Sequence, residues 1–233
     1  MHFDFSLFKA YYFLSLPSSS QTASIATDSM PTTQYQHYIP QFILRRFAIA
    51  PPAHPRKEKR PGKKKTGNEM VKAVDLAKVP PEIIAAEVKR TFGQQDMYKD
   101  NSKYNPTDQM QMERKLGEIE QAASRIIARV VVAHSKGERR ITLPRSDKDL
   151  LRKFQFVMKY RAPLFFRRFN HLTAEAYDSN DRASFLEYLR KKGFVRPLDV
   201  WFDNLMKIID EPMDPDGNWI MNLSKSIYPP DAI

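Results

Sequence analysis

Through much of this chain, apolar side chains recur at intervals of three and four residues, the spacing that places them on one face of a helix. The clearest example is a helix predicted from about residue 108 to 134, which Thr107 or Asp108 can cap and after which Gly137 can close the last turn. Its apolar positions form a seam suited to packing against another helix. These positions are Met112, Leu116, Ile119, Ala123, Ile126 and Val130.

The same spacing predicts further helices toward the C-terminus. They cover about 147–171, 171–178, 181–192 and a segment that begins at Pro197. Pro163 should kink the first of these helices, because proline lacks a backbone donor and its ring clashes with the preceding turn. The segment after Pro197 carries its own apolar stripe, made of Leu198, Trp201, Leu205, Ile208 and Ile209.

The region before these helices predicts a mixture of elements. Pro40 suits a first helical turn, where its missing N–H would have no partner anyway, and a short helix is predicted over 40–48. Residues 71–76 alternate between apolar and polar side chains, which is typical of a strand, and 87–92 is the expected partner, although a helix stays possible there. We therefore expect a mainly α protein, a multi-helix bundle with a small two-stranded β element near the N-terminus.

Two stretches fall outside this regular pattern. Residues 1–35 contain a long Ser-, Thr- and Ala-rich run, which predicts a disordered or non-native N-terminal extension with Met30 as an alternative start. Residues 51–69 are basic, rich in proline and without periodicity, which indicates a loop inserted into a single domain over 36–233. No apolar run approaches the roughly 20 residues of a membrane-spanning helix, so no membrane partner is expected.

The formal net charge of +11 is concentrated in two patches. Residues 55–65 carry seven basic side chains against one acidic side chain, and residues 145–170 carry eight against two. The chain has no cysteine, which excludes disulfides and thiolate metal sites and fits a cytoplasmic or nuclear location.

The two basic patches favour nucleic acid or another polyanion as partner. The first can also be a nuclear import signal or a merely solvated insertion. The second mixes basic and aromatic residues, which suits backbone binding with base stacking, although a packed helix with a basic outer face gives the same spacing. The residues that would contact the polyanion are Arg56, Lys57, Lys59, Arg60, Lys63, Lys64, Lys65, Arg152, Lys159, Arg167 and Arg168.

Four polar residues next to apolar faces are the candidates for catalysis, namely His37, Glu113, Glu120 and Arg161. Glu113 and Glu120 lie about 10.5 Å apart along one side of their predicted helix. A seam-edge glutamate facing an inward Arg161 would form a charge-assisted pair, and we favour a structural pair that orients two helices. The alternative is a metal-dependent nuclease or other phosphodiester hydrolase, with His37 and a glutamate as base or metal ligands.

Standard catalytic motifs are absent from the sequence. It has no Gly-rich phosphate loop, no Gly-x-Ser-x-Gly and no His-Glu-x-x-His, and Asp214-x-Asp216-Gly217 lacks the third oxygen ligand and closing glutamate of a calcium loop. We therefore predict no cofactor, with a divalent metal only under the hydrolase alternative. The leading expectation is a non-enzymatic binding protein with weak polyanion affinity and an unknown oligomeric state.

Several ordered blocks between residues 36 and 232 match one family. They are Gln36-His37-Tyr38-Ile39-Pro40-Gln41-Phe42, Leu44-Arg45-Arg46-Phe47, Arg90-Thr91-Phe92-Gly93-Gln94, Asp96-Met97-Tyr98, Glu113-Arg114-Lys115-Leu116, Ile119-Glu120, Lys153-Phe154, Met158-Lys159-Tyr160-Arg161, Asn180-Asp181-Arg182, Arg196-Pro197-Leu198-Asp199-Val200-Trp201 and Ile227-Tyr228-Pro229. On these blocks the chain resembles an uncharacterised family, a domain of unknown function in its fungal-type form. The resemblance implies no activity, cofactor or substrate. It also implies that 51–69 is a variable insertion and that a C-terminal portion beyond Asp231-Ala232 is missing, which leaves a truncated, poorly folding product as a third possibility.

Overall fold

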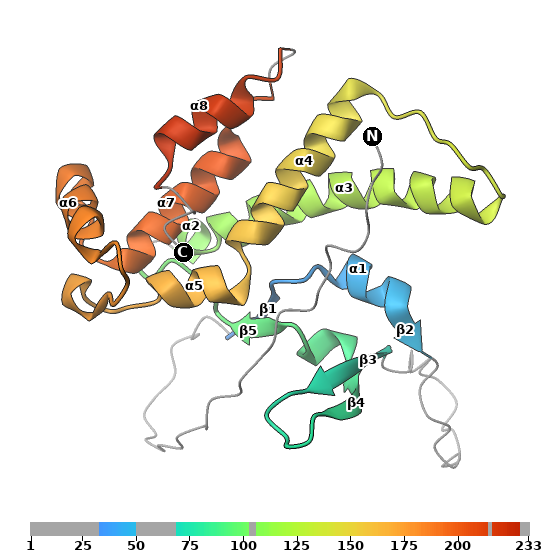
Figure 1. The fold of residues 1–233 in the computed structure, drawn as a ribbon, viewed down its shortest axis with the longest axis horizontal. Helices are drawn as coiled ribbons and strands as arrows, with labels where there is room; N and C mark the ends of the chain where they lie inside the picture. The colour runs from blue at the N-terminus through green and yellow to red at the C-terminus, as the bar shows by residue number, and fades with distance from the viewer. Residues whose placement is uncertain (1–32, 50–68, 103–105, 214–215, 229–233) are drawn as a thin grey trace. The chain divides into compact units, whose positions relative to one another are not determined.

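The computed structural model describes residues 33–49, 69–102, 106–213 and 216–228 (Figure 1). The chain divides into two compact units, where the sequence predicts a single domain over 36–233. The described part of the first unit is 41–49 and 69–92, and the second unit takes 33–40 and the described residues from 93 onward. Most of the predicted N-terminal extension and nearly all of the predicted basic loop lie outside the described residues.

The first unit is a small antiparallel sheet with short helical turns. Its elements are α1 (Gln41–Leu44), the 3-10 helix η2 (Arg45–Phe47), β2 (Ala48–Ile49), β3 (Met70–Asp75), β4 (Glu82–Glu87) and the 3-10 helix η3 (Val88–Arg90). The three strands pair in the order β2-β3-β4. The predicted strand partner over 87–92 is wrong, because a short turn after Asp75 brings the chain back at Glu82, which pairs with Asp75. The predicted two-stranded element is thus part of a three-stranded sheet.

The second unit is mainly helical, and the prediction of a mainly α protein is confirmed for the described residues. Its elements are β1 (Tyr35–His37), β5 (Gly93–Gln95), α2 (Pro106–Gln109), α3 (Gln111–Ser135), α4 (Arg145–Tyr160), α5 (Pro163–Phe169), the 3-10 helix η4 (Ala174–Ala176), α6 (Arg182–Lys192), α7 (Pro197–Asp210) and α8 (Trp219–Ser226). The strands β1 and β5 form a separate antiparallel pair that the sequence does not predict, with His37 opposite Gly93.

The helices of the second unit follow the predicted periodicity with three exceptions. Five of the six seam residues of α3 are buried, and the predicted kink at Pro163 is a complete break between α4 and α5. The residue before a proline avoids the helical conformation, and Ala162 is extended. The predicted helix over 171–178 is wrong: only η4 forms there, Leu172 is 88% exposed, and Tyr177 is the single buried residue of the segment, which therefore has no apolar stripe of helical spacing. The sequence also misses α8, which buries Trp219 and Leu223.

The core of the second unit surrounds α7, which contacts α3, α4, α5 and α8. Trp201 of α7 is fully buried, stacks on Tyr98 with ring centroids 5.9 Å apart, and donates its indole N–H to the Tyr160 carbonyl at 2.9 Å. Burying an aromatic side chain of this kind stabilises a fold by about 1.5–3 kcal/mol. Figure 1 shows that α3 and α4 diverge toward the segment 136–144 that joins them.

Candidate functional site

Arg161 is the residue at which most of the candidate catalytic residues meet. It follows α4 directly, and its side chain is only 2% exposed. The Nε atom donates to the Tyr98 hydroxyl at 2.9 Å, Nη1 donates to Glu120 Oε1, and Nη2 donates to the main-chain carbonyl of His37. All three guanidinium nitrogens therefore have a partner inside the second unit.

The surroundings of Arg161 keep it charged. Burial acts to lower the pKa of Arg161, but Tyr98 and Glu120 outweigh burial, and the pKa is raised above its ordinary value. Burial also raises the pKa of Tyr98 to about 12, so that its hydroxyl stays neutral. That hydroxyl accepts from Arg161 and donates to the His37 carbonyl at 3.2 Å. The arrangement is a satisfied polar network in a buried environment.

The two candidate glutamates of α3 differ in their relation to Arg161. Glu120 forms the ion pair, and its side chain is 24% exposed. The side chain of Glu113 makes no hydrogen bond or ion pair with any residue that the structure describes, and it lies where it interacts electrostatically with both Arg161 and Glu120. Burial raises the pKa of Glu113, and the nearby Glu120 charge adds to that effect while Arg161 opposes it. The seam-edge pair that the sequence favours is thus between Glu120 and Arg161.

His37 takes part in this network through its main chain. The residue lies in β1, half-buried, and its imidazole meets the Tyr35 ring edge-on with centroids 5.2 Å apart. Its carbonyl oxygen accepts hydrogen bonds from Arg161 and Tyr98. Next to it, the Gln36 side-chain oxygen accepts from the Tyr98 amide at 2.5 Å. Together these bonds hold β1 against α3 and the end of α4.

Metal chemistry finds no support in the geometry of this network. Across the described ranges, no group of three or more His, Asp or Glu side chains is placed to hold a metal ion. Each guanidinium nitrogen of Arg161 already donates to a protein group, and the side chain is only 2% exposed, so little of it is accessible to a substrate. What the arrangement does is fix four segments of the chain to one another.

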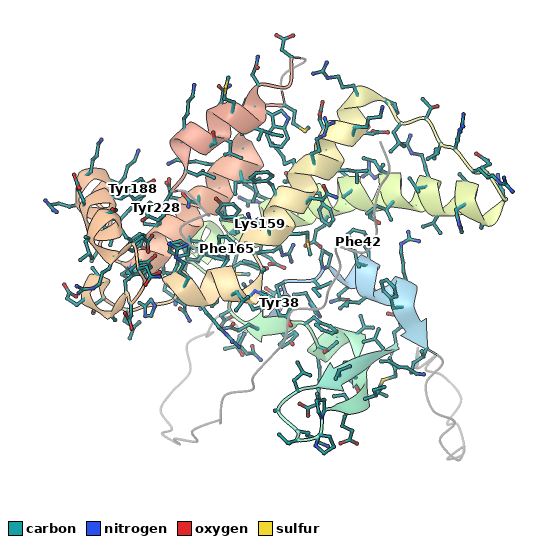
Figure 2. The ribbon with its side chains drawn as sticks, viewed as in Figure 1. Tyr38, Phe42, Lys159, Phe165, Tyr188 and Tyr228 are labelled. Atoms are coloured by element: carbon teal, nitrogen blue, oxygen red, sulfur yellow. The ribbon has the colours of Figure 1, made fainter. Side chains whose placement is uncertain are left out.

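Arg168, one of the predicted polyanion contacts, belongs to a second internal network. Its side chain is 9% exposed and donates to the Tyr177 hydroxyl at 2.7 Å and to Asp181 at 2.5 Å. The Tyr228 hydroxyl donates to the same carboxylate at 2.6 Å. Figure 2 shows Tyr228 beside Tyr188, and the rings of these two tyrosines meet edge-on with their centroids 4.9 Å apart. Burial acts to raise the pKa of Asp181, but the bonds from Tyr228 and Tyr177 and the Arg168 charge lower it overall.

The other predicted polyanion contacts have different surroundings. Arg152 pairs with Asp149 at 2.6 Å. Lys159 is exposed, with its ammonium 6.0 Å from the centre of the Phe165 ring, and Figure 2 shows these two side chains as neighbours. Arg167 is exposed as well. The seven basic residues between Arg56 and Lys65 lie outside the described residues.

A third group of basic residues lies along the C-terminal half of α3, the segment 136–144 and the first turn of α4. We call it the α3–α4 basic surface, and it consists of Arg125, Arg129, Lys136, Arg139, Arg140, Arg145 and Lys148. Two of its members have carboxylate partners: Arg129 binds Asp147, and Arg145 lies 3.6 Å from Asp149. The remaining five are exposed, and their side chains have no hydrogen bond or ion pair with any described residue.

A hollow of opposite character lies between α2, α7 and the loop before α7. Its volume is about 350 Å³, and its described lining combines apolar side chains such as Met112 and Phe202 with four aspartates and no lysine or arginine. The aspartates are Asp100, Asp108, Asp199 and Asp203. Three of these aspartates have basic partners. Arg196 binds Asp199 at 2.5 Å and lies 3.6 Å from Asp100, and Lys207 binds Asp203 at 2.5 Å, so ion pairs balance most of the negative charge of the hollow.

Comparison with known families decides where this chain belongs. The family model described as "Protein of unknown function (DUF4238)" matches residues 35–233. The chain is a member of the DUF4238 family. This membership confirms the resemblance found in the sequence blocks, and it carries no activity. No curated protein and no solved structure matches the chain.

The sequence reasoning misses most of the α3–α4 basic surface of this DUF4238 chain, since only Arg145 and Lys148 of it fall within the predicted basic patch over 145–170. Its signal was present, because Lys136, Arg139 and Arg140 stand close together in the sequence with only Glu138 between them as an acid. Counting charge over residues 55–65 and 145–170 hides this group, because the net charge of all other residues together is close to zero. Among the described residues, no helix has both the length and the apolar character needed to cross a membrane.

Proposed function

We propose that this chain is a non-enzymatic binding protein whose α3–α4 basic surface contacts a polyanion, with nucleic acid as the partner class. The observation that carries the proposal is the set of five exposed cations whose side chains have no partner in the described residues. They are Arg125, Lys136, Arg139, Arg140 and Lys148.

Unpaired exposed cations are the groups that bind phosphates most readily. A carboxylate partner offsets the charge of an arginine and occupies some of its donors, whereas an unpaired arginine offers its full charge and all five N–H groups to a phosphate. Each phosphate neutralised releases counterions, so affinity falls with salt by a slope of about 0.9 per contact on B-DNA. Lys159 and Arg167 are exposed too, but each has interactions of its own, so neither is counted among the five.

The basic run between Arg56 and Lys65 supports the same proposal from the sequence. Runs of this composition are typical of phosphate-contacting arms and of nuclear import signals. On this ground we place the proposed function in the cytoplasm or the nucleus.

The hydrolase alternative gains no observation that favours it. Glu120 and the His37 main chain meet at Arg161, but Arg161 donates to protein groups, His37 contributes its carbonyl, and Glu113 interacts with them only electrostatically. A base or a nucleophile needs access to a substrate within hydrogen-bonding distance. We therefore propose binding without catalysis.

The test compares two variants that lose the same charge. Arg139→Gln/Arg140→Gln removes two unpaired cations from the α3–α4 basic surface, and Arg190→Gln/Lys191→Gln removes two exposed cations from α6. Fluorescence anisotropy with a labelled oligonucleotide duplex, read between about 50 and 200 mM salt, gives affinity and salt slope.

We expect the first variant to bind more weakly and to lose up to about 1.8 from the salt slope, and the α6 variant to change little. The proposal fails if the unmodified protein does not bind at the lowest salt, or if its binding is indifferent to salt. Equal effects of the two variants would place the contact elsewhere.

A further inference from the structure

The segment that joins α3 to α4 carries an exposed threonine behind two arginines. Residues 138–144 form neither helix nor strand, and Arg139, Arg140 and Thr142 are all exposed. The order along the chain is Arg139-Arg140-Ile141-Thr142. The threonine hydroxyl has no hydrogen bond with any described residue, so it is available to react.

We propose that Thr142 is a phosphorylation site for a basophilic protein kinase, one that selects a hydroxyl preceded by arginines at the third and second positions before it. Kinases choose substrates by such charge patterns, because acidic pockets in the kinase receive the basic side chains. Here both arginines are exposed and neither has a carboxylate partner among the described residues.

The local backbone supports access by a kinase. A kinase needs several substrate residues in an extended conformation, and this segment has no helical hydrogen bonds to break. Figure 1 shows that the segment spans the open ends of two diverging helices. Ile141 is 40% exposed, so the position between the arginines and the threonine is accessible as well. By contrast, the Ser135 hydroxyl donates to the Val132 carbonyl at 2.8 Å within α3.

The chemistry is an ordinary phosphoryl transfer from MgATP. The Thr142 hydroxyl oxygen forms a bond to the γ-phosphorus, and the bond between that phosphorus and the β–γ bridging oxygen breaks. The hydroxyl proton passes to the catalytic carboxylate of the kinase, and ADP leaves. The product carries about −1.5 to −2 charge at neutral pH.

The modification would regulate the binding proposed above, and this part of the inference rests on that proposed function. The new phosphate lies two residues from Arg140 and three from Arg145 in the sequence. Its charge cancels about two of the five unpaired cations, so affinity for nucleic acid should fall on the order of tenfold near physiological salt. The salt slope should become shallower by about 1.8.

The first experiment tests the site without any nucleic acid. The full chain is incubated with MgATP and the catalytic subunit of the cyclic-AMP-dependent protein kinase as the basophilic probe, and peptide mapping locates the phosphate. We expect Thr142 to be modified, Thr142→Ala to lose that phosphate, and Arg139→Gln/Arg140→Gln to react more than tenfold more slowly. The exposed threonine variant Thr173→Ala, whose residue has no arginine at the second or third position before it, is the matched control and should react like the unmodified protein.

Thr66 follows three lysines in the sequence and is the competing acceptor that mapping must separate. The proposal is overturned if phosphate is found on Thr66 but not on Thr142. It is also overturned if Thr142→Ala and the protein without substitutions incorporate equal amounts of phosphate. The same holds if the full chain incorporates no phosphate.

The second experiment repeats the anisotropy titration with the phosphorylated protein. Weaker binding with a shallower salt slope, absent in Thr142→Ala treated in the same way, supports regulation. If complete phosphorylation leaves the affinity for nucleic acid unchanged, the regulatory role is overturned, while the assignment of Thr142 as a phosphorylation site stands. If neither form binds nucleic acid, the proposed function fails while the mapped site stands, so the two failures are distinguishable.

Discussion

Arginine has two opposite uses in the second unit, at Arg161 and in the α3–α4 basic surface. Arg161 is 2% exposed, and each of its three nitrogens donates to a protein group. The side chains of Arg139 and Arg140 are exposed and have no partner among the described residues. A charge count gives these residues the same weight, but only the second pair is both exposed and unpaired among the described residues, and so accessible to a ligand.

The difference in burial also decides whether an arginine contributes to folding stability or to binding. A buried charge needs its partner, because removing one member leaves the other uncompensated in surroundings that solvate it poorly. An exposed charge adds little to stability and acts instead through the long-range field that attracts a polyanion. Substitutions at the two places should therefore separate stability from binding.

The largest effect is expected at Arg161. Replacing it with methionine keeps the approximate volume but leaves Glu120 without its ion-pair partner and removes one of the two donors to the His37 carbonyl. Breaking a buried pair in this way costs about 3–5 kcal/mol of unfolding free energy. Urea unfolding followed by circular dichroism measures the loss.

The double variant Arg161→Met/Glu120→Leu is the control for that result. It removes the uncompensated carboxylate as well, so it should be more stable than Arg161→Met alone. A loss below about 1 kcal/mol in the single variant would mean that the three hydrogen bonds of the guanidinium contribute little to the stability of the fold.

The Asp181 network should give the next largest effect. Asp181→Asn keeps the shape but loses the charge that Arg168, Tyr177 and Tyr228 bind, and hydrogen bonds to a charged group are worth about 1.5–3 kcal/mol. Because the pKa of Asp181 is below its ordinary value of 3.8, its stabilisation is complete above pH 3.8 and disappears as the pH falls through the folded-state pKa.

Unfolding of the native protein and of Asp181→Asn, measured side by side from pH 6 to pH 2, tests both parts. The gap between the two proteins should be constant down to about pH 4 and then close. A gap that widens in acid would reverse the sign and contradict the network.

Replacing Glu113 should change the stability less, and it should stabilise the folded protein instead of destabilising it. Burial raises its pKa above the ordinary value of 4.5, so the folded protein holds the proton more tightly than the unfolded chain does. Native stability then falls as the pH rises from 4.5 through the folded-state pKa, and Glu113→Gln should stabilise the protein at pH 7 by on the order of 1 kcal/mol or less.

The pH dependence identifies the cause of that gain. The advantage of Glu113→Gln should vanish below pH 4.5, where the carboxyl is protonated in both states. Stabilisation that persists unchanged into acid would point to better packing of the amide. A destabilised Glu113→Gln at pH 7 would show that the ionised carboxylate is needed by Arg161.

The sequence predicts those parts of this fold in which apolar residues recur with a regular period. The α3 seam is visible because buried positions such as Leu116 and Ala123 recur with the helical period, and the break at Pro163 follows from its backbone chemistry. The predicted helix over 171–178 fails because propensity without an apolar stripe is weak: Leu172 is exposed, and Tyr177 is the single buried residue of the segment.

The candidate site is predictable only in part. An inward Arg161 and a seam-edge glutamate follow from helical periodicity, and the structure pairs Arg161 with Glu120. The third partner does not follow, because any residue supplies a main-chain carbonyl, and nothing in the side chain of His37 signals that its backbone is the acceptor. The role of Tyr98 is hidden for a related reason, since it is distant in sequence from every group it binds.

Substitutions in the α3–α4 basic surface should have the smallest effect on stability and the largest effect on binding. Arg139→Gln/Arg140→Gln removes two exposed side chains that contact no carboxylate among the described residues, so the unfolding free energy should change by no more than about 0.5 kcal/mol. Thermal unfolding of this variant should coincide with that of the native protein, while its anisotropy titration shifts to weaker binding. If the variant unfolds far more easily, these arginines are structural like Arg161, and the contrast between a buried and a binding arginine does not hold for this chain.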